Sequence, residues 1–294
     1  MRFRPMFALW LCLLAACIPP LQAEQPVPKA FTPSPSTKPL PKPGPHDWLA
    51  QHRERGQTFK QFKIGIHNKP SKKRGTIYLQ PVGNFSGPRA VELELLREFT
   101  STFFELPVVV RKPLSDAEFP SRKHKVFGRQ LHSEKALAIL KKHLPDDAYC
   151  MLAVTLVDLY PAPSWNFVFG QASLHARVGI FSFARYSPKK GTLSEEELRM
   201  LKLRAFKVLA HEAGHMFGIH HCTAHHCGMN GSNNLDETDR APLHYCPVCL
   251  RKLHDSVGFD VAKRDLRLAG VLDKAGLKGE ATWYRDRRAW LVSK

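Results

Sequence analysis

The sequence predicts an α/β fold followed by a mostly helical C-terminal part. Short runs rich in valine, isoleucine and leucine alternate with segments whose apolar residues recur at helical spacing, and strands interleaved with helices are typical of this class. The apolar fraction of 43% is that of a globular protein. About 250 residues follow the start of this pattern, enough for one large domain, so residues 47–294 are expected to share one core.

The N-terminus begins with a short basic leader and an apolar run over residues 6–16. Such a run is too short to span a bilayer but has the length of a signal-peptide core. The run ends in Leu14-Ala15-Ala16-Cys17, which looks like the processing site of a bacterial lipoprotein. Residues 1–17 are therefore expected to be a signal peptide, with Cys17 as the lipidated first residue of the mature chain. Ordinary signal cleavage after Ala23 is the alternative.

Residues 18–46 hold ten of the 23 prolines, mixed with lysine, serine and threonine. This composition favours extended polyproline-like backbone and does not build a core. Behind an anchored cysteine it predicts a stiff linker that holds the domain away from a membrane. A proline-rich ligand for a partner domain is the alternative.

The domain itself is expected to contain strands over residues 77–83, 107–112, 150–159 and 178–186, and helices over residues 87–104, 133–143, 261–272 and 281–292. The run 150–159 is nearly all apolar, as a strand buried on both faces should be. The last two helices are amphipathic and are expected to cover the core, with Trp283 and Trp290 as anchors.

A further helix has a clear start in the sequence. Ser194 and Glu197 have the spacing of a capping box, and acidic residues fill the first turn, where the helix dipole favours them. An apolar stripe follows, formed by Leu198, Leu201, Ala205, Val208 and Leu209. The stripe predicts that this helix packs under the sheet.

The end of this helix carries a candidate metal site. His211 and His215 are four residues apart and project from one helical face, and neutral imidazole is a good zinc ligand. Gly218 is expected to end the helix in a left-handed conformation and turn the chain back, so that His221 becomes the third ligand. His220 is adjacent, and only the spacing favours His221. The alternative is a solvated, histidine-rich helix end.

Glu212 follows the first of these histidines. From that position its carboxylate is able to reach a metal-bound water and act as a general base. Three histidine ligands leave the fourth position of a zinc ion open for that water. The pattern therefore predicts a catalytic type of zinc site.

The extended motif H-E-x-x-H-x-x-G-x-x-H with a downstream methionine is that of the metzincin metallopeptidases. Behind the last histidine follow C-x4-C-x-M, a spacer of sixteen residues, and C-x-x-C. This cysteine frame resembles that of the archaemetzincin family, and so does the segment 169–186. The resemblance covers roughly residues 75–260 and rests on specific motifs.

The resemblance implies a metzincin-like zinc peptidase with a mixed sheet and an active-site helix. In metzincins an edge strand pairs with the extended substrate, and residues 178–186 are the candidate, although a core strand is equally compatible with their sequence. By the same resemblance Met229 lies in a turn beneath the metal and supplies an apolar floor rather than a ligand.

Four cysteines, Cys222, Cys227, Cys246 and Cys249, have the spacing of a tetrahedral structural zinc site, and the archaemetzincin family uses them in this way. Two zinc ions per chain are therefore expected, one catalytic and one structural. Thiols outside the cytoplasm are usually oxidised, so two disulfides, Cys222 with Cys227 and Cys246 with Cys249, are the alternative. Cys150 lies in an apolar run and is expected to be an inert buried thiol.

A net charge of +18 is high for 294 residues and favours contact with anionic surfaces such as lipid headgroups. Nucleic acid is the rival explanation, in which a cysteine zinc site and a basic face form a binding module. The export signal argues against it, so no nucleic-acid partner is expected.

The sequence thus predicts an exported, membrane-anchored zinc peptidase that faces the periplasm or the cell exterior. Its partner is expected to be a peptide or protein substrate, and the chain is expected to act as a monomer. A zinc-stabilised binding protein with lost or negligible peptidase activity is the alternative.

Overall fold

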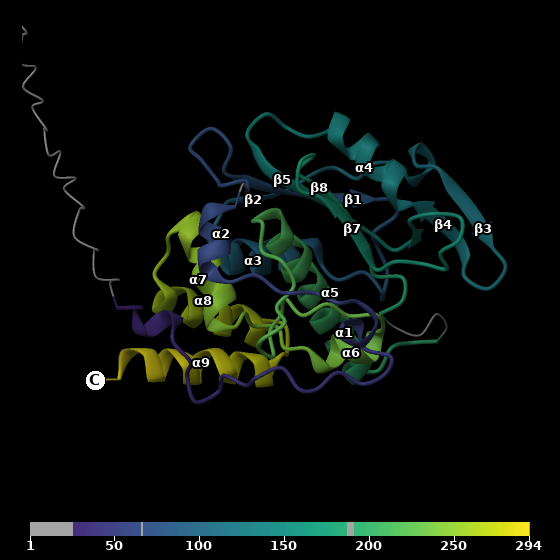
Figure 1. Ribbon diagram of the computed structural model, residues 1–294. Helices are drawn as coiled ribbons and strands as arrows, with labels where there is room; N and C mark the ends of the chain where they lie inside the picture. Colours follow the sequence, from purple (N-terminus) through teal and green to yellow (C-terminus); the bar gives the residue numbers. More distant parts are fainter. Residues whose placement is uncertain (1–25, 66, 187–190, 294) are drawn as a thin grey trace, which may run out of the picture.

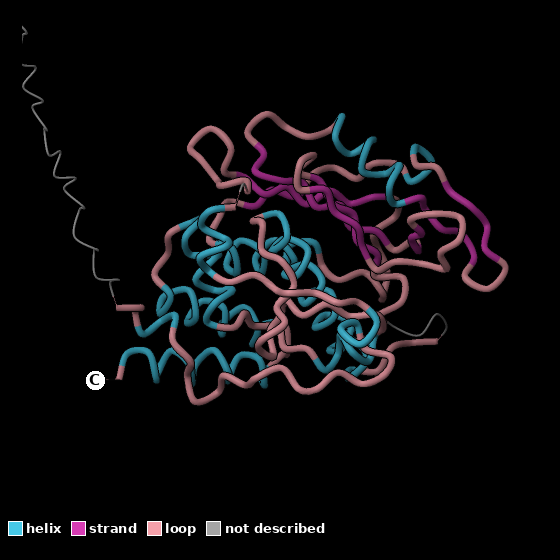
Figure 2. The backbone as a smooth tube through the Cα atoms, in the orientation of Figure 1, coloured by secondary structure: helices cyan, strands magenta, loops and turns pink. Residues whose placement is uncertain are grey.

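The computed structural model of the chain describes residues 26–65, 67–186 and 191–293. A twisted sheet forms one layer, and most helices lie on one of its faces (Figure 1; Figure 2). The strands of the described residues are β1 (Thr76–Val82), β2 (Val108–Val110), β3 (Ser121–His124), β4 (Gly128–His132), β5 (Ala148–Thr155), β6 (Asp158–Tyr160), β7 (Gly170–Ser173) and β8 (Val178–Ser182).

The α-helices of the described residues are α1 (Trp48–Gln51), α2 (Phe59–Ile64), α3 (Leu93–Phe104), α4 (Ser133–Lys142), α5 (Glu195–Met216), α6 (Leu235–Arg240), α7 (Pro247–Val257), α8 (Val261–Lys274) and α9 (Lys278–Val292). Two 3-10 turns are η1 (Lys29–Phe31) and η2 (Asp116–Glu118). None of these helices combines the length and the apolar character needed to cross a membrane.

The main sheet has the strand order β2-β1-β5-β8-β7. Strands β2, β1, β5 and β8 are parallel to their neighbours, and β7 pairs antiparallel with β8, so the sheet is mixed. Helix α4 covers one face, whereas α3, α5 and the C-terminal helices lie on the other (Figure 1). Because both faces are covered, β5 and β8 are buried along their whole length. The predicted α/β class with a mixed sheet is confirmed.

The expected strand over residues 150–159 is two strands in two sheets. β5 ends at Thr155, whose hydroxyl accepts a hydrogen bond from the Val157 amide at 3.1 Å, and this local bond bends the chain. β6 then joins a second sheet of order β3-β4-β6. The single-strand prediction was wrong because a buried hydrophobic run carries no sign of a change of partner.

The helix expected over residues 87–104 begins only at Leu93. Gly87 has φ +87°, and the Ala90 amide donates to its carbonyl in a turn, so the chain enters the helix several residues later. The other predicted helices lie close to their expected positions.

The expected edge strand over residues 178–186 lies inside the sheet. β8 is flanked by β5 and β7, and of the two edge strands of this described sheet, β2 and β7, the one beside β8 and the histidine site is β7. Gly170 and Gly179 allow this pairing to pack closely, because a Cβ at either position would meet the ring of Phe181. The strand available to a substrate is therefore β7.

The expected spacer over residues 18–46 is described from residue 26 onward, and that part lies along the body of the protein (Figure 1). The Lys38 carbonyl accepts from the His226 amide at 3.0 Å, and the Leu40 amide donates to the Ala224 carbonyl at 3.1 Å. Proline removes donors but keeps its carbonyls, so an extended proline-rich segment still pairs with a neighbouring chain. The predicted signal peptide and Cys17 lie outside the described residues.

Candidate metal centre and active site

Helix α5 carries three of the predicted site residues in its last two turns. Its N-terminus has the expected capping box: the Glu197 amide donates to the Ser194 hydroxyl, and the Ser194 amide donates to the Glu197 carboxylate. Buried residues along the helix, among them Leu201, Ala205 and Leu209, pack it into the core. This packing holds His211, Glu212 and His215 on a rigid element.

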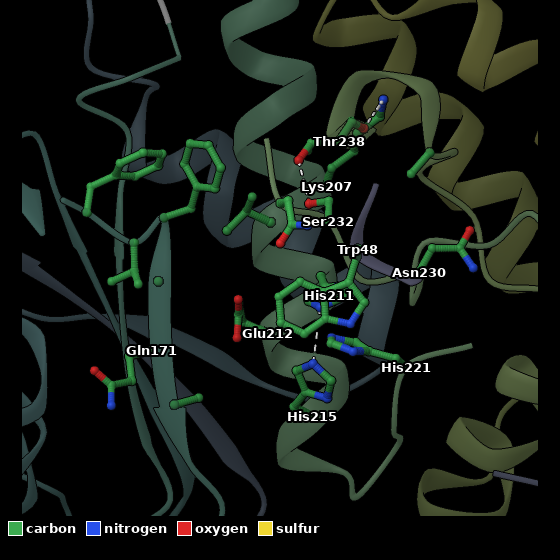
Figure 3. A pocket seen from close by; sticks show the side chains of 18 of the residues that line it. Trp48, Gln171, Lys207, His211, Glu212, His215, His221, Asn230, Ser232 and Thr238 are labelled. Atoms are coloured by element: carbon green, nitrogen blue, oxygen red, sulfur yellow. Dashed lines mark hydrogen bonds between the residues drawn. The ribbon is translucent and has the colours of Figure 1, made fainter. Parts of the chain in front are cut away.

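Gly218 turns the chain back after α5. Its φ is +74°, and its amide donates to the His215 carbonyl at 2.8 Å. A side chain at this position would also collide with His67. The predicted helix end is confirmed. Residues 218–222, which we call the return loop, bring His221 beside the two helical histidines (Figure 3).

The three imidazoles converge. One ring nitrogen from each of His211, His215 and His221 lies within 4.8 Å of the other two. His211 Nδ1 is 3.0 Å from the Gly228 carbonyl, and His215 Nδ1 is 2.7 Å from the Ile219 carbonyl. A carbonyl oxygen only accepts hydrogen bonds, so both Nδ1 atoms carry the proton. Each Nε2 atom then presents a lone pair.

These two lone pairs face each other. His211 Nε2 and His215 Nε2 are 3.1 Å apart, and with both protons on Nδ1 neither atom is a donor to the other. A cation between them would accept both lone pairs and remove their repulsion, so the donor set fits a zinc ion. Removal from water and the neighbouring imidazoles lower the pKa of His211, and burial lowers that of His215 to about 4. Both rings are therefore neutral, as ligands must be.

The third histidine is held differently. His221 Nδ1 is 2.9 and 3.0 Å from the two carboxylate oxygens of Glu54, which leaves Nε2 for the metal position. The neighbouring His220 is exposed, and its backbone amide donates to the side chain of Gln57. The structure places His221, the histidine that the spacing favours, beside His211 and His215. Glu54 was missed by sequence reasoning.

Glu212 lies between the imidazoles and strand β7 (Figure 3). Its carboxylate is partly buried, and removal from water raises the pKa of Glu212 to about 7. A cation held by the neighbouring imidazoles would lower this pKa again, because it favours the charged carboxylate. The position suits proton transfer in the cavity next to the metal ligands.

A cavity of about 850 Å³ lies in front of these residues. One wall is β7 and the aromatic segment before it, which contributes Trp165, Phe167 and Phe169. The opposite wall contains Trp48 from the N-terminal segment and Asn230 from the loop after the histidines (Figure 3). Trp48 was not predicted, and only its tertiary position identifies it. A cleft between an edge strand and a metal site fits an extended peptide.

Met229 packs against helix α5. The residue is fully buried, and a Cβ on Gly214 of helix α5 would lie 2.5 Å from its sulfur. Gly214 therefore allows the Met229 turn to approach the helix between His211 and His215. The sulfur packs against the helix at Gly214 and gives the site a soft apolar floor.

The four cysteines also converge. Their sulfur atoms lie within 4.8 Å of one another, and Cys222 Sγ is 3.8 Å from Cys246 Sγ. Tetrahedral zinc with Zn–S bonds of about 2.3 Å would place its sulfur ligands about 3.8 Å apart, so this donor set fits zinc. All four residues are free thiols in this structure, which is not the arrangement of the disulfide alternative.

Backbone amides surround the cysteine group. Cys246 begins helix α7, its sulfur accepts from the Cys249 amide, and Cys227 Sγ accepts from the Cys246 amide at 3.1 Å. Hydrogen bonds from the other thiols, Cys222 first, lower the pKa of Cys246. Because a helix N-terminus also favours a thiolate, this group is suited to bind a cation. Cys150 is separate and buried, and burial raises its pKa.

The chain is similar in sequence to known proteins. The model of peptidase family M54 matches residues 104–255, which contain the three histidines and the four cysteines but neither Trp48 nor Glu54. Archaemetzincin-2 of Mus musculus is 37% identical over 295 residues, covering 84% of this chain and 82% of that protein. Archaemetzincin-2 of Homo sapiens is 37% identical over 268 residues, covering 80% and 74%. The solved structure of archaemetzincin from Methanopyrus kandleri aligns with a TM-score of 0.48 and 27% identity, covering 65% and 99%.

Proposed function

This chain belongs to the archaemetzincin family of zinc metallopeptidases, and we propose that it hydrolyses peptide bonds with His211, His215 and His221 as zinc ligands and Glu212 as the general base. The observation that carries the proposal is the pair of facing Nε2 atoms on α5, which fits a bound cation, beside a carboxylate in a peptide-sized cleft. Its substrates are peptides or proteins.

The proposed mechanism assigns a separate task to each part of the cleft. Zinc held by the histidines would lower the pKa of a water molecule and polarise the scissile carbonyl. Glu212 takes the proton from the attacking water and passes it to the leaving amine. The free edge of β7 pairs with the substrate backbone, and the aromatic wall before it shields the reacting groups from bulk water.

The second proposed zinc ion is structural and is held by the four cysteines. Cys222 directly follows His221, and its amide donates to the Met229 carbonyl at 2.7 Å. A metal at the cysteine group would therefore tie the return loop and the Met229 turn to the start of α7. The bound metal would thereby stabilise the return loop, which presents His221.

The N-terminal sequence supports a further proposal about location. Residues 1–17 would form a lipoprotein-type signal peptide, and residues 47–294 the exported metallopeptidase domain, anchored through lipid at Cys17. The protein would then act as a monomer at a membrane, facing the periplasm or the cell exterior. The net charge of +18 supports attraction to anionic headgroups.

One experiment tests the proposed function directly. The zinc content of the purified chain is measured together with cleavage of a broad peptide library. Two zinc ions per chain and cleavage that stops when the more weakly held zinc is removed are the expected results. Full zinc occupancy without cleavage anywhere in the library would favour a zinc-stabilised binding protein instead.

A further inference from the structure

The support of His221 comes from a distant part of the chain. His211 and His215 each bond through Nδ1 to a main-chain carbonyl from residues 219–228, close in sequence to themselves. His221 instead bonds through Nδ1 to Glu54, which lies 167 residues earlier. Both carboxylate oxygens are within 3.0 Å of this nitrogen, and the side chains are 28% and 19% exposed for Glu54 and His221, so the pair is partly sheltered from water.

Glu54 belongs to a segment that we call the N-terminal strap, residues 47–57. Trp48 packs the edge of its ring against His221, with ring centroids 5.3 Å apart and an interplanar angle of 81°. The Gln57 side chain donates to the Gly218 carbonyl at 3.2 Å and accepts from the His220 amide at 3.3 Å. The strap therefore contacts the loop at His221 and at two residues before it.

The strap is itself fixed at both ends. The Trp48 amide donates to the two Glu237 carboxylate oxygens at 2.9 and 3.0 Å, and Asp47 pairs with Arg240 at 2.5 Å. At the other end the buried Lys252 ammonium donates to the Gln57 carbonyl. Glu54 is thus presented by a segment held on α6 and α7, and its position does not depend on His221 alone.

A carboxylate partner has effects that a carbonyl partner lacks. It fixes the ring rotation and the tautomer of the imidazole, and its negative charge strengthens the ligand nitrogen on the other side of the ring. His221 needs this help most, because it lies on a loop, whereas His211 and His215 are held by the backbone of α5.

We propose that Glu54 is a positioning residue for His221 and that the N-terminal strap completes the histidine metal site. This inference rests on the proposed function, because it concerns the zinc ion that the three histidines hold. It adds a residue from outside the H-E-x-x-H-x-x-G-x-x-H motif and makes residues 47–57, at the start of the domain, part of the active site.

The test measures zinc affinity rather than activity. Wild type, Glu54→Gln and Glu54→Ala are each titrated with a competing chelator, and the zinc remaining is counted per chain. Glu54→Gln keeps an oxygen that accepts from Nδ1 but lacks the charge, so we expect the order wild type, Gln, Ala in falling affinity. Loss of such a partner typically costs ~10–100-fold in metal affinity, and this is the range expected for Glu54→Ala.

A matched control and a spectroscopic reading accompany the titration. Glu118→Gln alters a carboxylate that faces a different histidine, His143, at 4.0 Å, and should leave the zinc affinity unchanged. Cobalt(II) introduced into the histidine site, with zinc retained in the cysteine site, reports ligand geometry through its visible spectrum. We expect both Glu54 variants to shift this spectrum and Glu118→Gln to match wild type.

Each outcome has a defined meaning. If wild type holds the histidine-site zinc and both Glu54 variants hold it within about twofold, less than the ~10-fold minimum expected for a lost partner, the inference is wrong while the proposed function stands. If wild type itself binds no metal at the histidines, the proposed function fails. Should Glu54→Ala lose its fold, as judged by circular dichroism, Glu54→Gln decides: an unchanged affinity and cobalt spectrum in that variant would overturn the proposal.

Discussion

At the scale of single residues, Glu212 gives the most direct test of mechanism. Glu212 does not belong to the group of three histidines whose ring nitrogens converge. Glu212→Gln should therefore leave the zinc content unchanged while removing the proton acceptor. General-base assistance contributes ~10²–10⁴-fold, and kcat for peptide hydrolysis should fall by about that factor. The measurement pairs a steady-state peptide assay with zinc analysis of the same preparation.

His221→Ala serves as the comparison for that variant. It should lose the histidine-site zinc and keep the cysteine-site zinc, because the two donor groups are separate. Hydrolysis at the wild-type rate by Glu212→Gln would show that another group accepts the proton.

Lys207 provides a pH-dependent prediction one turn before His211. Its ammonium donates to the Thr238 and Asp239 carbonyls at the end of α6, and burial lowers the pKa of Lys207 from 10.5 to about 8. Between about pH 8 and pH 10.5 the unfolded chain keeps the proton on Lys207 and the folded chain loses it. The free energy of unfolding therefore rises with pH in this range. From pH 7 to pH 9 wild type should gain about 1 kcal/mol over Lys207→Met.

Urea unfolding of both proteins at the two pH values measures this difference. Titration of all other groups cancels in the comparison, since it is common to both proteins. Parallel stability profiles would mean that the Lys207 ammonium is better solvated than its burial indicates.

The sequence predicted the residues whose signal is local. The histidines, Glu212 and the cysteines occupy short motifs with fixed spacing, and spacing alone determines which side chains share a helical face or a turn. Trp48 and Glu54 have no such signal. They reach the site through contacts with α6 and the return loop, and one glutamate among the charged residues 52–55 carries no sequence signal of its own until the fold is known.

At the scale of secondary-structure elements, strand β7 is the proposed partner of the substrate. The Ser182 amide donates to the Phe169 carbonyl, and bonds alternate along an antiparallel pair, so Ala172 directs its amide away from β8. Ala172→Pro should remove a donor to the substrate without breaking the pairing with β8. We expect kcat/KM to fall roughly fivefold, about 1 kcal/mol for one hydrogen bond.

Thermal unfolding of this variant provides the control, since an unchanged midpoint shows that the sheet is intact. Ala172→Ser, which keeps the amide, should retain the wild-type kcat/KM. Equal kcat/KM in the proline variant would indicate that substrate does not pair with β7 at this position.

The cysteine group links two elements, the return loop and the start of α7. A chelator of moderate strength should first remove the zinc at the histidines, where a cavity gives access, and leave the fold unchanged. Removal of the second zinc should unfold the return loop, because metal binding there is part of the folding free energy. Mass spectrometry and circular dichroism during the titration separate the two steps. Two disulfides in the purified protein, detected by its mass, would contradict a metal at this group.

Elements with a capping box or a long periodic pattern were predicted well, as α4 and α5 show. The sequence did not predict the break between β5 and β6 or the position of β7 at the edge of the sheet. β7 is short, with the sequence Gly-Gln-Ala-Ser, and its identity as a strand depends on its pairing with β8 rather than on its own residues.

At the scale of the whole molecule, the two ends of the described chain lie together. The Lys29 ammonium donates to the Ser293 carbonyl at 2.6 Å beside the end of α9 (Figure 1). From there residues 26–46 follow the body to the N-terminal strap. A membrane anchor at Cys17 would therefore hold the catalytic body by a shorter connection than residues 18–46 alone suggest.

The proposed anchor gives the prediction for the molecule as a whole. A processed lipoprotein carries several acyl chains, and several chains give stable membrane residence where one chain gives only marginal binding. Wild type expressed with its own leader should sediment with membranes and resist extraction by salt, whereas Cys17→Ser should appear in the soluble fraction. Salt resistance distinguishes a lipid anchor from attraction through the net charge of +18, which salt weakens. Soluble wild type whose first residue is Glu24 would instead establish ordinary signal cleavage.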